Sequence, residues 1–269
     1  MRQNMMFDRP QRRLLPLRSL APNILTVLGL CAGLTGVQLA IHDRFDMAVL
    51  AIAVAAIIDT LDGRVARLLK GTSKFGAELD SLSDFVNFGV TPALILYLWT
   101  LETLGGLGWI IVLGFAVCGA LRLARFNTAL EQPDRPEWSV RFFTGVPAPA
   151  GACLSLLPIA LYLLGWEWLR EAALLTGIYT SAIAFLMISR IPTFSLKRAH
   201  IGREMVLPIL LIAGVAAAAV VGYPWLMYVL AALGYLTLIP FSVISHHRHA
   251  QAHAQPAMTR TPDGPGTAA

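Results

Sequence analysis

Four aspartates lie close together within a stretch whose neighbours on both sides are apolar. Asp59 and Asp62 are three residues apart and share one face of a helix; Asp80 and Asp84 are four apart and share one face of the next. Carboxylates held near each other repel unless a cation lies between them, and Mg²⁺, Mn²⁺ and Ca²⁺ prefer carboxylate oxygens. The pattern therefore predicts a divalent-cation site. Four acids suffice for two ions, a pair that neutralises a diphosphate and its leaving group.

The segment between the two pairs, KGTSKFG, contains two glycines and interrupts the helical pattern. We expect residues 59–84 to fold back around it as a helical hairpin. The midpoint of Asp62 and Asp80 is residue 71, and that of Asp59 and Asp84 is 71.5, so both pairs are nearly symmetric about the break. Because a helix rises about 1.5 Å per residue, each acid should face a partner at a similar depth.

Basic residues and a glycine accompany the acids. Arg67, Lys70 and Lys74 follow the first pair, and their positive charge suits a phosphate ligand. Gly63 directly follows Asp62, where the missing side chain lets a ligand approach the backbone. The whole stretch is therefore suited to an anionic ligand that carries its own metal ions.

Two other interpretations of the acids remain open. Asp59 and Asp62 have the spacing for structural salt bridges with Arg64 or Arg67 on the same helix. Acidic residues inside a membrane protein also mark ion pathways, which leaves an ion-coupled transporter as a second alternative.

The composition places the chain among membrane proteins. Of its 269 residues, 56% are hydrophobic and only 14% charged, against about 25% charged in a soluble domain, and the mean hydropathy is +0.64. Cys31, Cys118 and Cys153 all lie in apolar runs, which indicates buried thiols and no disulfide framework. The net charge of +5 is interpreted as membrane topology, and no nucleic-acid partner is expected.

The chain is predicted to be an all-α polytopic membrane protein with about eight transmembrane helices, since a crossing needs about 20 mostly apolar residues. The predicted spans are 22–41, 47–69, 77–99, 107–126, 147–165, 172–190, 205–222 and 224–244. Before them lies a basic N-terminal segment, residues 1–20. After them, residues 248–269 are rich in Ala, Pro, Thr and Gly, which predicts a disordered tail.

The distribution of lysine and arginine predicts the orientation. Nineteen of these residues fall on the side of the termini and the acidic stretch, whereas only Arg44 and Arg170 fall on the other. Positive charge collects on the cytoplasmic side of a membrane protein. We therefore expect a multi-pass protein of the cell membrane whose termini and acidic site are cytoplasmic.

The acidic stretch also contains a motif of eight positions, D-x2-D-G-x2-A-R-x8-G-x3-D-x3-D, with no departure. Its members are Asp59, Asp62, Gly63, Ala66, Arg67, Gly76, Asp80 and Asp84. This motif resembles the signature of the CDP-alcohol phosphatidyltransferases, and the resemblance extends over residues 21–200. It implies an all-helical and usually dimeric protein with six core spans around a cytoplasm-facing polar cavity. Residues 201–247 would then add two further helices.

The resemblance also implies roles for individual residues. Asp59, Asp62 and Asp80 match metal ligands, and Asp84 matches a residue shared between metal binding and general-base catalysis. Mg²⁺ or Mn²⁺ is the implied cofactor, with two ions. The residues implied to contact the CDP moiety are Gly63, Arg67 and Ser73, with Asn23 and Thr26 of the segment PNILT. For Asn23 a helix N-cap is an equally good interpretation.

Four further segments, LDSLSDFVNFGVTPA, ALRLARFN, FFTGVPAPAGA and SRIPTFSLKR, are similar to the branch of the family whose alcohol is serine. Asn87 stands where a serine is usual, which is a mild departure. The implied reaction is attack of the L-serine hydroxyl on the β-phosphorus of CDP-diacylglycerol, with release of CMP. Glycerol phosphate, inositol phosphate and choline remain alternative alcohols.

The resemblance leaves the group that binds the alcohol open. Basic residues at the cytoplasmic ends of the helices are candidates for the serine carboxylate or the lipid phosphate. They are Arg122, Arg125, Arg190 and Lys197. For the first two, a charge that orients the helix in the membrane is the alternative.

Overall fold

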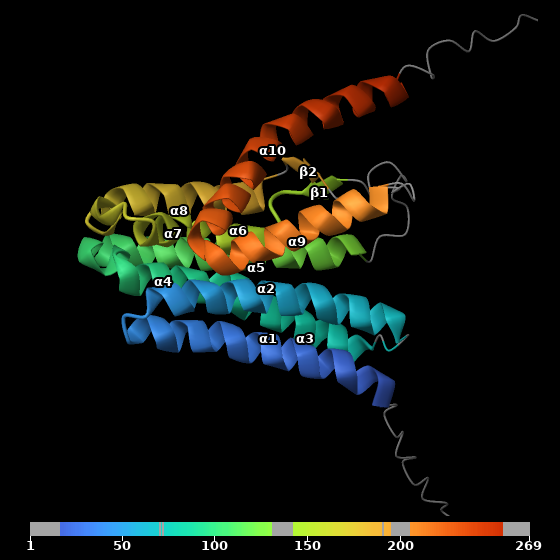
Figure 1. Ribbon diagram of the computed structural model, residues 1–269, viewed down its shortest axis with the longest axis horizontal. Coiled ribbons are helices and arrows are strands. Elements are labelled where there is room, and N and C mark those ends of the chain that lie inside the picture. The colour runs from blue at the N-terminus through green and yellow to red at the C-terminus, as the bar shows by residue number, and fades with distance from the viewer. Residues whose placement is uncertain are drawn as a thin grey trace, which may run out of the picture.

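The computed structural model describes residues 17–69, 71, 73–130, 142–189, 191–194 and 205–254, and these form a helical bundle with one small sheet (Figure 1). The elements are α1 (Leu17–Ile41), α2 (Phe45–Leu68), α3 (Lys74–Asp84), the π-helix η1 (Phe85–Val90), α4 (Thr91–Trp99), the 3₁₀-helix η2 (Leu101–Leu104), α5 (Gly106–Leu130), β1 (Phe142–Thr144), α6 (Ala148–Ser155), α7 (Leu157–Leu163), the 3₁₀-helix η4 (Glu167–Arg170), α8 (Ala173–Ile188), β2 (Pro192–Phe194), α9 (Val206–Gly222) and α10 (Pro224–Ala254).

Helices occupy all eight segments that the sequence predicts as spans. Three helical stretches in the described part of the chain are long and apolar enough to cross a membrane, which makes this a membrane protein. They are Leu20–Ile41, Lys74–Trp99 and Gly106–Ala129. α2 has 24 residues but carries the acidic site near its end, and the remaining apolar stretches, including Pro224–Ile239 of the longer α10, are shorter.

Proline divides one of the expected helices. The segment predicted over 147–165 is interrupted at Leu156, between α6 and α7. Pro158 has no N–H group, so the carbonyl of Leu154 cannot receive the bond that a continuous helix would give it. The chain turns at this point, and α7 packs against η4 and α10 while α6 packs against α8 and η1.

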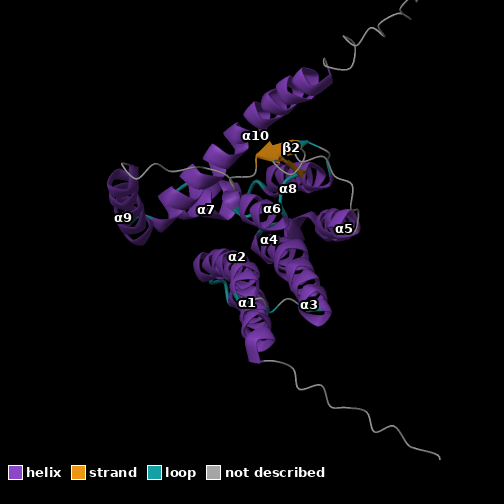
Figure 2. Cartoon of the chain, turned by 90° about the vertical axis from the view of Figure 1, so that its right-hand side faces the viewer, coloured by secondary structure: helices purple, strands orange, loops and turns teal. Residues whose placement is uncertain are grey.

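The sequence predicts that residues 59–84 pack on each other as a helical hairpin, but in the structure α2 and α3 each pack against α1. α2 packs most extensively on α1 along its length, and α1 also contacts α3 and α4. α2 and α3 are thus both held against α1, and Figure 2 shows the loop that joins them. The aspartates of α2 and α3 still converge, but α1 is the helix that packs against both α2 and α3.

α5 packs against η1 and α8 on the other side of the bundle. Gly119 of α5 lies directly over Gly89 of η1, because a Cβ on Gly119 would lie 3.1 Å from the Gly89 Cα. This close approach needs glycine and lets the two backbones touch. Helix α9 packs on α10, lies at the edge of the bundle opposite α5, and is exposed on nearly all sides (Figure 2).

A two-stranded antiparallel sheet joins two connections that are distant in sequence. β1 precedes α6 and β2 follows α8, and they pair with Phe142 opposite Phe194 and Thr144 opposite Pro192. Pro192 cannot donate to a ladder, which suits the end of a strand. The sheet ties the segment after α5 to the end of α8.

The charge asymmetry and the fold together predict how the chain is oriented. In a variant with Cys31, Cys118 and Cys153 replaced by alanine, Lys74→Cys and Glu167→Cys each introduce one exposed thiol, at opposite ends of the bundle. We expect a membrane-impermeant maleimide to label position 74 from the cytoplasmic side only and position 167 from the opposite side only. Labelling of position 74 from outside the cell would reverse the orientation.

Candidate metal centre

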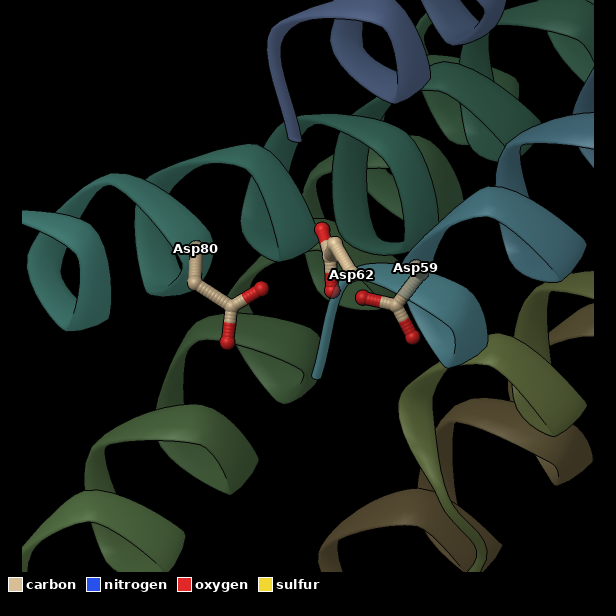
Figure 3. Close-up of side chains that lie close together, drawn as sticks. All are labelled: Asp59, Asp62 and Asp80. Carbon is tan, nitrogen blue, oxygen red and sulfur yellow. The ribbon is translucent and has the colours of Figure 1, made fainter. Parts of the chain in front are cut away.

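Three carboxylates converge where α2 and α3 meet (Figure 3). Asp59 and Asp62 come from α2 and Asp80 from α3, and one oxygen of each lies within 4.8 Å of the others. Asp62 is buried, with 4% of its surface exposed, while Asp59 and Asp80 are partly buried. This is the donor chemistry and spacing that a hard divalent cation requires.

Asp84 lies one turn beyond Asp80, where α3 gives way to η1. It is outside the group of three. Its strongest interaction with a charged group is with Asp59, followed by Asp80 and the guanidinium of Arg122. Asp59, Asp62 and Asp80 therefore come together as one group, and Asp84 lies beside Asp59.

The basic residues of α2 do not neutralise these acids. In the described part of the chain the one ion pair joins Arg170 and Asp43, at 3.4 Å. Arg67 instead donates from Nε to the carbonyl of Gly63, at 3.0 Å. The salt-bridge alternative is therefore wrong in this structure. Because the carboxylates converge with no ion pair among the described residues, they fit a bound divalent cation.

The orientation of Asp62 is fixed from α1. Thr26 donates from Oγ1 to Asp62 Oδ2 at 2.8 Å, and the same hydroxyl lies 3.1 Å from the carbonyl of Pro22. Thr26 is itself buried. A hydroxyl that holds one carboxylate oxygen leaves the other available to a ligand, as the second-shell partners of metal sites do.

A cavity of about 460 Å³ adjoins the three carboxylates. It contains all five residues expected to contact a nucleotide, together with two of the acids. Its lining is Pro22, Asn23, Thr26, Asp62, Gly63, Ala66, Arg67, Gly71, Ser73, Gly76, Ala77 and Asp80. A Cβ on Gly63 would meet no protein atom within 4 Å, so the open side of this glycine faces free space.

Two residues of this cavity have structural roles as well. α1 begins at Leu17, so the N-cap interpretation of Asn23 is wrong: Asn23 lies inside the helix. Its side chain lies against Gly76, where a Cβ would be 2.7 Å from the Asn23 Oδ1. Ser73 is the N-cap of α3 and accepts from the N–H of Gly76 at 3.0 Å.

Of the basic residues expected to bind the alcohol, two lie in the described part of the chain. Arg122 donates from Nε to the carbonyl of Val146 at 2.7 Å and also interacts with Asp84. Arg125 donates to the carbonyl of Ile188. Both therefore link α5 to other segments. Arg190 and Lys197 lie outside the described residues.

A second, apolar groove lies on the opposite face of α2. It has a volume of about 570 Å³ and is formed by α2, α6 and α10, with Arg64 at the end nearest the acidic site and Tyr228 and Tyr235 along α10. Tyr235 also interacts electrostatically with Arg122, which in turn interacts with Asp84. Sequence analysis missed this groove, because an aromatic residue on an apolar helix is equally typical of packing.

The comparison with known proteins agrees with this geometry. The family model described as CDP-alcohol phosphatidyltransferase matches residues 19–191, and one described as CDP-alcohol phosphatidyltransferase 2 matches residues 204–240. The chain belongs to the CDP-alcohol phosphatidyltransferase family, which confirms the resemblance seen in its motif. The second match covers all of α9 and the first half of α10, which the motif does not include.

Relatives with an established name are similar over most of the chain. A CDP-diacylglycerol–serine O-phosphatidyltransferase of Mycobacterium leprae is 40% identical over 251 residues, which are 93% of this chain and 83% of the relative. The enzyme of that name from Mycobacterium tuberculosis is 39% identical over 86% of this chain and 80% of its own. The one from Bacillus subtilis is 34% identical over 63% of this chain and 87% of its own.

The convergence of the carboxylates predicts metal binding that depends on each of them. Asp80→Asn removes one ligand charge and should weaken Mn²⁺ binding about tenfold or more, measured by electron paramagnetic resonance titration of the purified protein. Asp46→Asn is the control. Asp46 lies in the first turn of α2, far along that helix from Asp59 and Asp62, so its replacement should leave the affinity unchanged. Equal affinities in the two variants would mean that Asp80 is not a ligand.

Proposed function

We propose that this protein is a CDP-diacylglycerol–serine O-phosphatidyltransferase, which makes phosphatidylserine and CMP from CDP-diacylglycerol and L-serine. The observation that carries the proposal is the convergence of the motif aspartates beside a cavity lined by all five residues expected to contact a nucleotide. The names of the relatives from Mycobacterium and Bacillus support serine as the alcohol.

The cavity beside the acids is the proposed site of the CDP moiety. Asn23 and Ser73 supply polar groups at its wall, Arg67 supplies positive charge, and Gly63 leaves its space open. The hydrogen bond from Arg67 Nε to its own helix holds the guanidinium in place, which lowers the entropic cost of binding a phosphate. Thr26 contributes by holding Asp62.

Asp59, Asp62, Asp80 and Asp84 are the proposed ligands of two divalent cations, Mg²⁺ or Mn²⁺. Bound there, the ions would neutralise the diphosphate and stabilise the charge that develops on the departing CMP. The carboxylates supply negative charge in a partly buried position, where their attraction for a cation is stronger than it would be in bulk water.

Asp84 is proposed as the general base. In the reaction the serine hydroxyl oxygen forms a bond to the β-phosphorus, the bond from that phosphorus to the oxygen of CMP breaks, and the hydroxyl proton passes to the Asp84 carboxylate. Asp84 suits this role because it stands outside the tight group of three, one turn beyond Asp80, where the resemblance places the base.

Arg122 is the strongest candidate for binding the serine carboxylate, because it is the basic residue that interacts with Asp84. Its Nε is bonded to Val146, so its terminal nitrogens are the groups that would hold a carboxylate. Arg125, Arg190 and Lys197 remain further candidates for the carboxylate or the lipid phosphate. The apolar groove that reaches Tyr235 is the proposed path of an acyl chain of the lipid substrate.

We further propose that the chain crosses the membrane eight times, with six of the spans forming the family core around a polar cavity that faces the cytoplasm. Both termini and the active site would then be cytoplasmic, and the protein would be a homodimer. The excess of Lys and Arg on the side of the acidic site supports the orientation.

Turnover with a panel of alcohols tests the activity. With CDP-diacylglycerol and Mn²⁺ or Mg²⁺, the purified protein should release CMP when L-serine is added and much less with glycerol phosphate, inositol phosphate or choline. EDTA should abolish release, and either metal should restore it. Preference for another alcohol would make this a sibling transferase, while absence of CMP release with every alcohol would favour the ion-coupled transporter.

Replacing Asp84 separates the base from the metal ligands. Asp84→Asn keeps the size and one oxygen but cannot accept the proton, so kcat should fall by about 10²–10⁴ while CDP-diacylglycerol still binds in part. Asp62→Asn should instead weaken metal and nucleotide binding together. Turnover at saturating metal and nucleotide affinity distinguish the two. Recovery of Asp84→Asn to nearly normal turnover in excess metal would make Asp84 only a ligand.

A further inference from the structure

A chain of hydrogen bonds leads from the π-helix η1 to the metal centre. Asn87 Nδ2 lies 3.3 Å from Ser83 Oγ, and Ser83 Oγ lies 3.4 Å from the main-chain carbonyl of Thr26. Thr26 in turn donates from its own hydroxyl to Asp62 Oδ2 at 2.8 Å. Thr26 of α1 thereby connects α2 on one side with α3 and its continuation η1 on the other.

The members of this chain are buried. Asn87 is 2% exposed, Ser83 5% and Thr26 6%. The links are therefore shielded from water, so a water molecule cannot readily replace a link that is lost. The relay is also local to the site, since Ser83 lies directly between Asp80 and Asp84 on α3.

The side chain of Asn87 is clamped between helices. A Cβ at Gly33 of α1 would overlap the Asn87 Oδ1, so α1 passes the amide at a distance that only glycine allows. That same oxygen has no hydrogen-bond partner among the described residues. A buried acceptor without a partner costs stability. This indicates that the amide serves to position its neighbour Ser83 and does not serve stability alone.

The helix geometry around Asn87 is unusual as well. The α-helix widens to a π-helix at Phe85, immediately after Asp84. Each extra residue in a turn rotates the following side chains, and such turns occur often at functional sites. Here the widened turn begins where α3 stops supplying acids to the site and places Asn87 against both Ser83 and Gly33.

We propose that Ser83 and Asn87 are positioning residues, which act through Thr26 to hold Asp62 of α2 in register with Asp80 and Asp84 of α3. The acids of α2 and α3 form one metal site only while α1 keeps a fixed axial position relative to both helices. Thr26 bonds to α2 through its side chain and to α3 through its carbonyl, so it sets both heights at once. The proposal rests on the metal centre of the proposed function.

The test is direct Mn²⁺ binding by the full-length protein in lipid nanodiscs, followed by electron paramagnetic resonance. Ser83→Ala removes the hydroxyl that makes two links of the relay. We expect its Mn²⁺ dissociation constant to rise about 10–100-fold, the usual effect of losing a second-shell partner. Turnover at saturating Mn²⁺ should stay within a few-fold of the parent, since the acids themselves are intact.

Ser155→Ala is the matched control. Ser155 is also a fully buried helical serine, but its hydroxyl bonds to Ala152 of its own helix. The two variants should lose similar thermal stability, and only Ser83→Ala should lose Mn²⁺ affinity. Thr26→Ser, which keeps the hydroxyl, should retain the affinity that Thr26→Val loses, and Asn87→Ala should show a smaller loss than Ser83→Ala.

The outcomes separate this proposal from the proposed function. If the parent protein binds Mn²⁺ and Ser83→Ala binds it as tightly as Ser155→Ala does, the positioning role is overturned and the metal centre stands. If the parent binds no Mn²⁺, the metal centre fails and the positioning role fails with it. Should Ser83→Ala not fold, Asn87→Ala, which removes the other end of the relay, takes its place: the positioning role is overturned if Asn87→Ala binds Mn²⁺ as tightly as Ser155→Ala does.

Discussion

The repulsion among the clustered carboxylates is the constraint on which the rest of this structure depends. Two unit charges 4.8 Å apart at an effective dielectric of about 20 repel by about 3 kcal/mol, so three ionised acids cost about 10 kcal/mol. That is comparable to the whole stability of a typical domain. The fold therefore has to supply rigid support for the acids, and the cell has to supply a cation. The packing of α1 against α2, α3 and α4 answers the first need.

The sequence was informative about the site because the chemistry is encoded in short spacings. The near symmetry of the four acids about residue 71 predicts that the acids of α2 and α3 converge, since helical rise converts numbering directly into depth, and three of them form one group. Of the five expected nucleotide contacts that line one cavity, Gly63, Arg67 and Ser73 lie close in sequence to an acid or to the break between the helices. Asn23 and Thr26 face them from α1.

What could not be predicted depends on packing between distant segments. The bond from Thr26 to Asp62 joins residues 36 apart in the chain and exists only because α1 lies along α2. Proline usually marks the first turn of a helix, so the local pattern favours a helix start near Asn23, yet Pro22 lies inside α1, which begins at Leu17. The β1–β2 ladder likewise pairs short segments about 50 residues apart, whose pattern alone is too brief to identify a strand. The break at Leu156, by contrast, was readable from Pro158.

The exposure of α9 has a consequence for how this chain can change over time. Among the described residues α9 packs chiefly on α10 and is exposed on nearly all its other sides, and in a membrane this apolar surface would meet lipid. Hydrocarbon tails adapt to any apolar side chain, whereas a packed core accepts only side chains of the right shape. Selection on α9 therefore acts on its hydrophobicity and length, and the order of its residues is free to drift. Among related chains, the alignment should blur along α9 while the acidic stretch of α2 and α3 stays sharp.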